Sequence, residues 1–204
     1  MEPVFIKTLS KSMKRKLPGI ASHKQMMISP SRYSMKNKSL GISASVLLLL
    51  YPQKSNWFFF LTKRSRDVEH HKGQVSLPGG VVKKNESKSD AALRETNEEI
   101  GINENIIKII GNLTSLYVPI SNFQIHPFVG WVERKPNTIV QYKEVESIFS
   151  VKLNELLLRK NLKKKKVKFS NQLTIVPYFD LNGETVWGAT SMILSEFKYI
   201  LENM

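Results

Sequence analysis

The chain of 204 residues contains no cysteine, which excludes disulfide bonds, thiolate nucleophiles and cysteine-ligated zinc. Long apolar runs are also missing, since the longest, Val46 to Tyr51, is far shorter than the roughly 20 residues of a membrane-spanning helix. The basic N-terminal residues lack the apolar segment of a secretory signal; a transit peptide is the less favoured alternative to an ordinary N-terminal helix. We therefore expect a globular, cytoplasmic protein without a membrane partner.

Acidic residues are few, with 17 Asp and Glu against 31 Lys and Arg and a net charge of +14. Two segments, 1–38 and 159–168, carry +8 and +7, so the rest of the chain is close to neutral. We interpret both segments as solvated surface, and the alternative is an electrostatic funnel for a polyphosphate ligand or for nucleic acid. The lysine run has no aromatic residue before Phe169, so a base-stacking surface is not indicated.

Apolar, β-branched runs alternate along the chain with segments of helical periodicity. The expected elements are a helix over 4–16, an irregular arm over 18–40, strands over 42–51 and 57–62, a turn at 78–80, a helix over 87–100, strands over 106–118 and 123–134, a helix over 152–160, one or two strands within 165–187 and a last helix over 190–202. This order predicts an α/β sandwich with a mixed sheet and helices on both faces. We divide the chain into a basic N-terminal helix and arm at 1–38 and a domain at 39–204.

Three glutamates, Glu95, Glu98 and Glu99, occupy the last turns of the helix expected over 87–100, which Gly101 ends as a C-cap. Carboxylates at this end of the helix dipole cost roughly 0.3–1 kcal/mol each, and Glu95 and Glu99 also repel each other. At helical spacing the three carboxylates share an arc of about 100°. An oxygen-only cluster suits Mg²⁺ or Mn²⁺ better than zinc, and the alternative is an exposed acidic helix end.

The pattern around these glutamates resembles the Nudix box, the signature of hydrolases that cleave nucleoside diphosphates linked to another moiety. The residues that match it, within a box spanning 80–102, are Gly80, Glu86, Arg94, Glu95, Glu98 and Glu99, followed by Gly101. The resemblance implies a Nudix-type α/β/α sandwich in which Glu86 and Arg94 brace the loop and helix and the three glutamates hold Mg²⁺ or Mn²⁺. It also makes Glu95 one candidate for the general base, although in this superfamily the base often lies outside the box. Thr96 departs mildly from the box, because an aliphatic residue is usual there.

Residues 61–80 resemble the extended motif of the coenzyme A diphosphatase branch, which reads Leu-Thr-x-Arg-Ser, a spaced aliphatic residue, His-x-Gly-Gln and Phe-Pro-Gly-Gly. Leu77 departs from the motif where Phe is usual, and Lys83 stands where many members carry an acid. Segments 126–130, 144–149 and 187–190 also look like this branch, so the resemblance covers about residues 38–200. It implies cleavage of coenzyme A or a derivative into 3′,5′-ADP and 4′-phosphopantetheine.

The residues that we expect to bind substrate are Arg64, His71, Gly79 and Gly80, with Arg66 as a weaker candidate. Glu144 lies where the superfamily sometimes supplies an extra carboxylate, so the resemblance makes it a weaker candidate for a catalytic role. Arginine suits the phosphates, and the glycines allow a tight turn with close backbone approach. Three alternatives stay open: another substrate such as ADP-ribose, a dinucleotide or a nucleoside triphosphate; an RNA-directed decapping or binding protein that uses the basic segments; and a non-catalytic module. The oligomeric state is also open, with a dimer as one arrangement.

Overall fold

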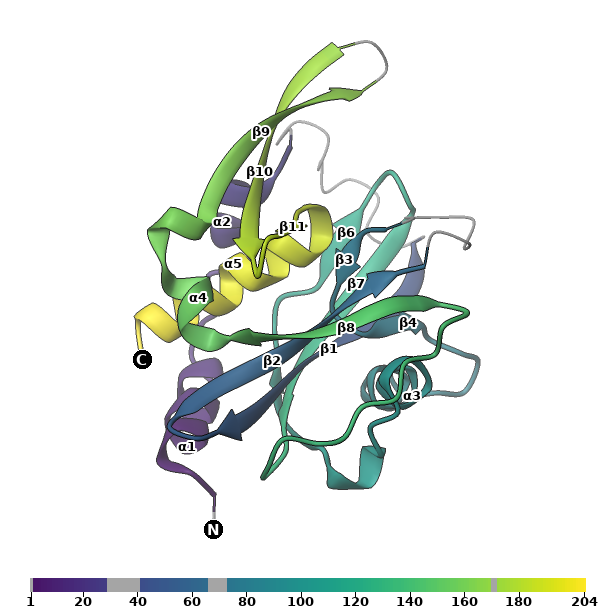
Figure 1. Cartoon of the computed structure of the whole chain (residues 1–204), viewed down its shortest axis with the longest axis vertical. Helices are drawn as coiled ribbons and strands as arrows, with labels where there is room; N and C mark the ends of the chain where they lie inside the picture. Colours follow the sequence, from purple (N-terminus) through teal and green to yellow (C-terminus); the bar gives the residue numbers. More distant parts are fainter. Residues whose placement is uncertain (1, 29–40, 66–72, 170–171) are drawn as a thin grey trace.

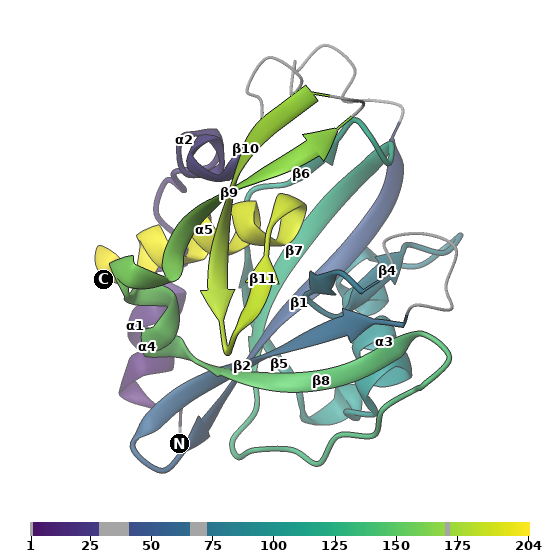
Figure 2. The same ribbon diagram turned by 45° about the horizontal axis from the view of Figure 1, so that its top comes forward.

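The computed structural model describes residues 2–28, 41–65, 73–169 and 172–204, which form two sheets and five α-helices (Figures 1 and 2). The helices are α1 (Val4–Met13), α2 (Ile20–His23), α3 (Lys88–Ile100), α4 (Leu153–Leu157) and α5 (Gly188–Glu202). The strands are β1 (Ile42–Gln53), β2 (Asn56–Arg64), β3 (Val75–Ser76), β4 (Gly79–Val81), β5 (Lys108–Asn112), β6 (Leu116–Val118), β7 (Phe123–Trp131), β8 (Val145–Lys152), β9 (Leu162–Phe169), β10 (Gln172–Leu181) and β11 (Glu184–Val186). Strands β1 to β8 form a mixed sheet, and β9 to β11 form a separate antiparallel sheet.

Strand β1 lies in the middle of the large sheet, antiparallel to β2 and β4 and parallel to β7. Its side chains alternate between two cores. Leu47 and Leu49 pack with Ala92 of α3, whereas Leu48 and Leu50 belong to the larger core that includes residues of α1 and α5. Since both faces of β1 are covered from Val46 to Tyr51, this part of the strand is a continuous apolar run. The predicted α/β sandwich with helices on both faces is confirmed.

The N-terminal segment packs into the larger core through Ile6 and Leu9 of α1. The helix predicted over 4–16 ends at Met13, and the prediction of an irregular arm is wrong for residues 20–26, which form α2 and a short 3₁₀ turn. A buried pair reinforces this docking, because His23 Nε2 lies 3.1 Å from Glu196 Oε2 on α5. Residues 29–40 of the predicted arm lie outside the described residues, and the domain boundary at residue 39 stays a prediction.

Several predicted elements need correction. The one or two strands predicted within 165–187 are three, β9 to β11, and the first begins at Leu162. The turn expected at 78–80 is wrong, because Gly79 and Gly80 lie in β4 and pair with β1. The strand expected over 106–118 is interrupted, and it is divided between β5 and β6. Strand β8 was not predicted, and the helix expected over 152–160 shortens to α4 and a 3₁₀ turn. The strand was missed because β8 is followed directly by α4 at Leu153, and the helical spacing of the leucines there hides the end of the alternating strand pattern.

The lysine run forms β9, which pairs with β10 on one side and is the edge strand of the small sheet (Figure 2). Lysines on an edge strand discourage pairing with another chain. Lys163 binds Asp180 at 2.6 Å, and Lys165 lies over the ring of Tyr178. These contacts place the run within the folded sheet and not in a loop. Among the described helices, none is long and apolar enough to cross a membrane.

Candidate active site

Both ends of helix α3 are fixed by local signals. The Ser87 side chain accepts a hydrogen bond from the Asp90 N–H at 3.1 Å, as an N-cap residue does. Gly101 ends the helix in the left-handed conformation with φ 70°, and its N–H bonds to Asn97 O. The predicted helix over 87–100 is therefore confirmed, with its glutamates on the last turns.

The three glutamates differ in exposure. The side chain of Glu95 is 14% exposed and that of Glu98 is 49% exposed, whereas Glu99 is buried. The Arg94 guanidinium lies between two of them, because its Nη1 donates to Glu95 Oε1 at 2.6 Å and to Glu98 Oε2 at 2.8 Å. Lys83 Nζ approaches Glu98 at 3.5 Å. The repulsion expected from the sequence is thus offset by cations from the helix and from the loop before it.

Arg94 also ties the preceding loop to the helix through Glu86. Its Nε and Nη2 donate to the two oxygens of Glu86 at 2.6 and 3.1 Å, a bidentate arrangement. The Lys83 N–H donates to the same carboxylate at 2.9 Å. Hydrogen bonds from the guanidinium, and then from this backbone N–H, lower the pKa of Glu86 to about 2. Glu86 is consequently ionised at any pH at which the protein would work.

The two glycines of β4 allow close approach and do not form a turn. Gly80 pairs with Ser45 of β1, and a Cβ on Gly80 would lie 2.5 Å from Glu95 Cδ. A Cβ on Gly79 would lie 2.3 Å from Ser45 O. The Gly79 N–H donates to Glu99 Oε2 at 3.3 Å. The missing side chains therefore let the strand lie directly against the carboxylates.

Burial raises the pKa of Glu99 to about 8, against the opposing effects of the Gly79 N–H and of the positive charge of Arg64. The negative charges of Glu95 and Glu144 add to the rise. Arg64 is the last residue of β2, and its Nε is buried without a hydrogen-bond partner in the structure. Glu144 is exposed.

The remaining expected substrate-binding residues, Arg66 and His71, lie outside the described residues. The described part of the expected site therefore brings together residues of β2, β4 and α3, with Glu144 from the connection between β7 and β8.

No three acidic or histidine side chains among the described residues form a ready metal site. Two of the three glutamates are instead bonded to Arg94. The donor chemistry nevertheless fits a hard divalent cation, because every side-chain donor is a carboxylate oxygen and Glu99 is a buried acid with little compensating charge.

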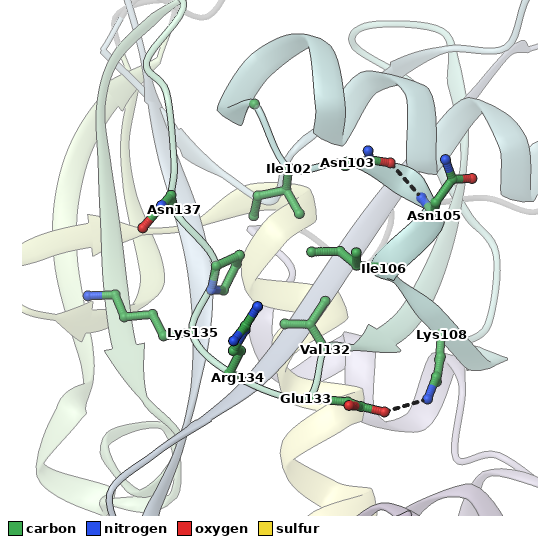
Figure 3. A pocket seen from close by; sticks show the side chains of 12 residues that line it. Ile102, Asn103, Asn105, Ile106, Lys108, Val132, Glu133, Arg134, Lys135 and Asn137 are labelled. Atoms are coloured by element: carbon green, nitrogen blue, oxygen red, sulfur yellow. Dashed lines mark hydrogen bonds and ion pairs between the residues drawn. The ribbon is translucent and has the colours of Figure 1, made fainter.

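A cavity of about 1000 Å³ lies beyond the C-terminal end of α3, between the start of β5 and the connection that follows β7 (Figure 3). Apolar Ile102, Ile106 and Val132 line it together with Arg134, and an ion pair joins Lys108 to Glu133 at 2.8 Å. None of the Nudix-box glutamates lines this cavity. We therefore do not include this cavity in the candidate active site, despite its volume.

The fold has close counterparts among solved structures. A Nudix hydrolase from M. smegmatis has a TM-score of 0.58 at 14% identity, with 80% of this chain and 87% of that chain covered. A MutT protein from Methanosarcina mazei has a TM-score of 0.51 at 20% identity, with 80% and 96% covered. These likenesses show that the chain has the same fold. The chain belongs to the Nudix hydrolase family, since the NUDIX domain matches residues 41–173.

Curated relatives agree with this assignment. Nudix hydrolase 3 of Caenorhabditis elegans is 30% identical over 178 residues, which cover 77% of this chain and 72% of the relative. A peroxisomal coenzyme A diphosphatase of the same organism is 36% identical over 118 residues, which cover 56% of this chain and 50% of that protein. An uncharacterized Nudix hydrolase of Pectobacterium atrosepticum is 31% identical over 137 residues, covering 67% and 71%. Nudix hydrolases generally use divalent metal ions.

Sequence reasoning missed three polar side chains on the sheet beside α3, Ser43, Ser45 and Gln124. It included the neighbouring His126 only as part of segment 126–130 in the branch resemblance. The signal for two of them was present, because Ser43 and Ser45 share the strand alternation of Leu47 and Leu49 and so point toward α3. Serines at positions that alternation assigns to the core show where the apolar pattern of this face ends. Gln124 and His126 could not be found in this way, because their place beside the serines depends on the register between β1 and β7.

Proposed function

We propose that this protein hydrolyses the diphosphate linkage of coenzyme A or of one of its derivatives, releasing 3′,5′-ADP and 4′-phosphopantetheine. One observation supports the proposal: the described ends of the segment that resembles the coenzyme A branch, Arg64 and Gly79–Gly80, lie beside the glutamates. Gly79 bonds to Glu99, Gly80 lies beneath Glu95, and Arg64 is close enough to lower the pKa of Glu99. The name of the 36% identical relative supports the same substrate.

In this proposal Glu95, Glu98 and Glu99 hold the divalent cation, and Glu86 with Arg94 keeps the loop and helix in place. A bound Mg²⁺ or Mn²⁺ would supply positive charge at the diphosphate oxygens and make a water molecule more acidic. Arg64 suits a phosphate oxygen of the substrate, since its buried Nε lacks a hydrogen-bond partner in the structure.

Two carboxylates are candidates for the general base, Glu95 on the helix and Glu144 outside it. Glu95 is bonded to Arg94, whereas Glu144 is exposed. Replacing each with Gln and recording kcat against pH separates them, because loss of the base removes the acidic limb of the profile. A variant that lowers kcat equally at every pH has lost a metal ligand or a structural contact instead.

A substrate panel tests the proposal. The protein is incubated with Mg²⁺ or Mn²⁺ and coenzyme A, ADP-ribose, dinucleotides, nucleoside triphosphates or capped RNA, and products are identified by mass. We expect 3′,5′-ADP from coenzyme A, and none when Glu99→Gln replaces the wild type. If coenzyme A survives while another diphosphate is cut efficiently, the substrate assignment is wrong and the family chemistry stands.

The cytoplasm is part of the same proposal, and it needs its own test because one relative is named as peroxisomal. Microscopy of the full chain carrying an internal tag in its native cells decides between compartments. Concentration of the signal in organelles would contradict a cytoplasmic location.

A further inference from the structure

The sheet face beside α3 changes from apolar to polar along β1. Leu47 and Leu49 pack under α3, whereas Ser45 and Ser43 continue the same alternation toward the start of the strand. The parallel neighbour β7 continues the change, because His126 stands opposite Ser45 and Gln124 stands opposite Ser43. These four residues form a polar strip on the face of the sheet that α3 covers.

Three atoms of the strip are buried and have no hydrogen-bond partner among the described residues: Ser43 Oγ, Ser45 Oγ and Gln124 Oε1. Ser45 is 0% exposed. Buried polar side-chain atoms are paired in the large majority of cases, and an unpaired one destabilises the folded protein. Three such atoms close together on two neighbouring strands therefore lower the stability of the folded protein, and a ligand that forms hydrogen bonds with them would offset this loss.

The strip begins at the carboxylates. Ser45 is paired on its other side with Gly80, which lies beneath Glu95. Since neighbouring strands are about 4.8 Å apart and alternate residues about 7 Å apart, the strip extends roughly 10 Å from Gly80 to His126 and about 7 Å along β1. A group attached to a phosphate held at the glutamates can therefore reach it directly.

The chemistry of the strip is neutral. His126 Nδ1 lies 2.9 Å from Ser115 Oγ, and burial together with the charge of Lys88 lowers the pKa of the imidazole. Tyr117 stands opposite Gln124 at the far end, partly exposed, with its hydroxyl bonded to Asn122. Neutral donors and acceptors beside an aromatic ring suit a base and a ribose. An aliphatic amide arm would bury methylene and methyl groups against these polar atoms and leave several unsatisfied.

We propose that the polar strip binds the nucleoside half of the substrate, with Ser43, Ser45 and Gln124 bonding its base and ribose while the diphosphate lies at the glutamates. The identity of this ligand rests on the proposed function above. The strip would thus set which nucleotides are accepted, while the glutamates set the reaction.

The test measures binding and stability in the same variants. Ser45→Ala and Gln124→Leu are compared with wild type for 3′,5′-ADP binding by calorimetry without metal, for KM and kcat with coenzyme A, and for Tm. We expect Kd and KM to rise about 2- to 12-fold for each lost hydrogen bond, with little change in kcat. Tm should stay unchanged or rise in Ser45→Ala, because an unpaired buried hydroxyl is removed.

Ser195→Ala is the matched control. Ser195 is also buried, but its hydroxyl donates to Ser22 O at 3.0 Å, far from the strip in the sequence. We expect this variant to lose Tm and to keep the wild-type Kd. A buried serine with a bonded hydroxyl and one without should therefore respond in opposite ways.

Several results would overturn the strip. The first is that the wild type binds neither 3′,5′-ADP nor ADP, and the second is that both variants keep Kd within twofold of the wild-type value. The third is that Ser45→Ala loses as much Tm as Ser195→Ala without a change in Kd. The fourth is that the variants weaken the binding of 4′-phosphopantetheine and not that of the nucleotide. Failure of the proposed function is distinguishable. If coenzyme A is not cut but both variants still weaken nucleotide binding, the strip stands and the substrate assignment falls.

Discussion

Replacing Gly80 with alanine would place a methyl group where the Glu95 carboxylate lies. The added Cβ would be 2.5 Å from Glu95 Cδ and 2.6 and 2.7 Å from its two oxygens. Ordinary van der Waals contact begins near 3.4 Å, so the carboxylate must move by roughly 1 Å. It can do so because it ends a flexible side chain, although the move disturbs its 2.6 Å hydrogen bond with Arg94.

The effect on activity should be large and the effect on stability small. A misplacement of about 1 Å can lower a rate on the order of 100-fold, and we expect that loss of kcat in Gly80→Ala. Gly79→Ala should behave differently, because its Cβ would lie 2.3 Å from Ser45 O and 2.6 Å from Val46 Cα. Backbone atoms cannot yield without separating β4 from β1, so we expect destabilisation of about 1–3 kcal/mol or more.

Thermal unfolding and diphosphate hydrolysis with Mg²⁺, measured on both variants, check this contrast. A loss of 1 kcal/mol corresponds to about 2–4 °C in Tm for a protein of this size. Gly80→Ala should melt close to wild type and be nearly inactive, whereas Gly79→Ala should melt earlier. Activity of Gly80→Ala within about threefold of wild type would refute the reasoning, since a loss well below the expected 100-fold means that Glu95 tolerates the move.

Arg94→Lys should lower kcat by at least about tenfold, because a lysine cannot replace the bidentate bond to Glu86, and a wild-type rate in steady-state kinetics would contradict this. Burial alone would raise the pKa of Glu196, but hydrogen bonds from His23 and Thr114 hold it below its ordinary value of 4.5. The ionised Glu196 therefore stabilises the folded protein above pH 4.5, and this stability is lost as the pH falls through the lower pKa of the folded state. Urea unfolding from pH 6 to 3 should show a falling free energy of unfolding in the wild type and a flatter pH dependence in Glu196→Gln. Deleting residues 1–27 should expose the core that α1 covers and lower Tm by several degrees, and an unchanged cooperative transition by calorimetry would contradict that.

Local signals made part of the site predictable. Helix α3 carries its N-cap, its left-handed Gly101 and its glutamates within fifteen residues, so spacing alone placed the carboxylates. The structural role of Gly79 and Gly80 could not be predicted from the local sequence. Two adjacent glycines usually indicate a turn, and only the pairing of β4 with β1 shows that they serve close packing. Strand β8 was missed for a different reason, since the helical spacing of the leucines that follow it hides where the strand period ends.

The double-sided burial of β1 also bears on how the chain finds its correct strand register. A slip of one residue normally exposes apolar side chains, but from Val46 to Tyr51 both faces of β1 are apolar and such a slip would exchange one core for the other. The glycines of β4 resist it, because only they fit opposite Ser45 and Val46. Gly79 and Gly80, which let β4 lie against the carboxylates, thus also select one alignment of β1 during folding. Substitutions at these glycines would therefore raise the fraction of misaligned chains as well as lower the rate of catalysis.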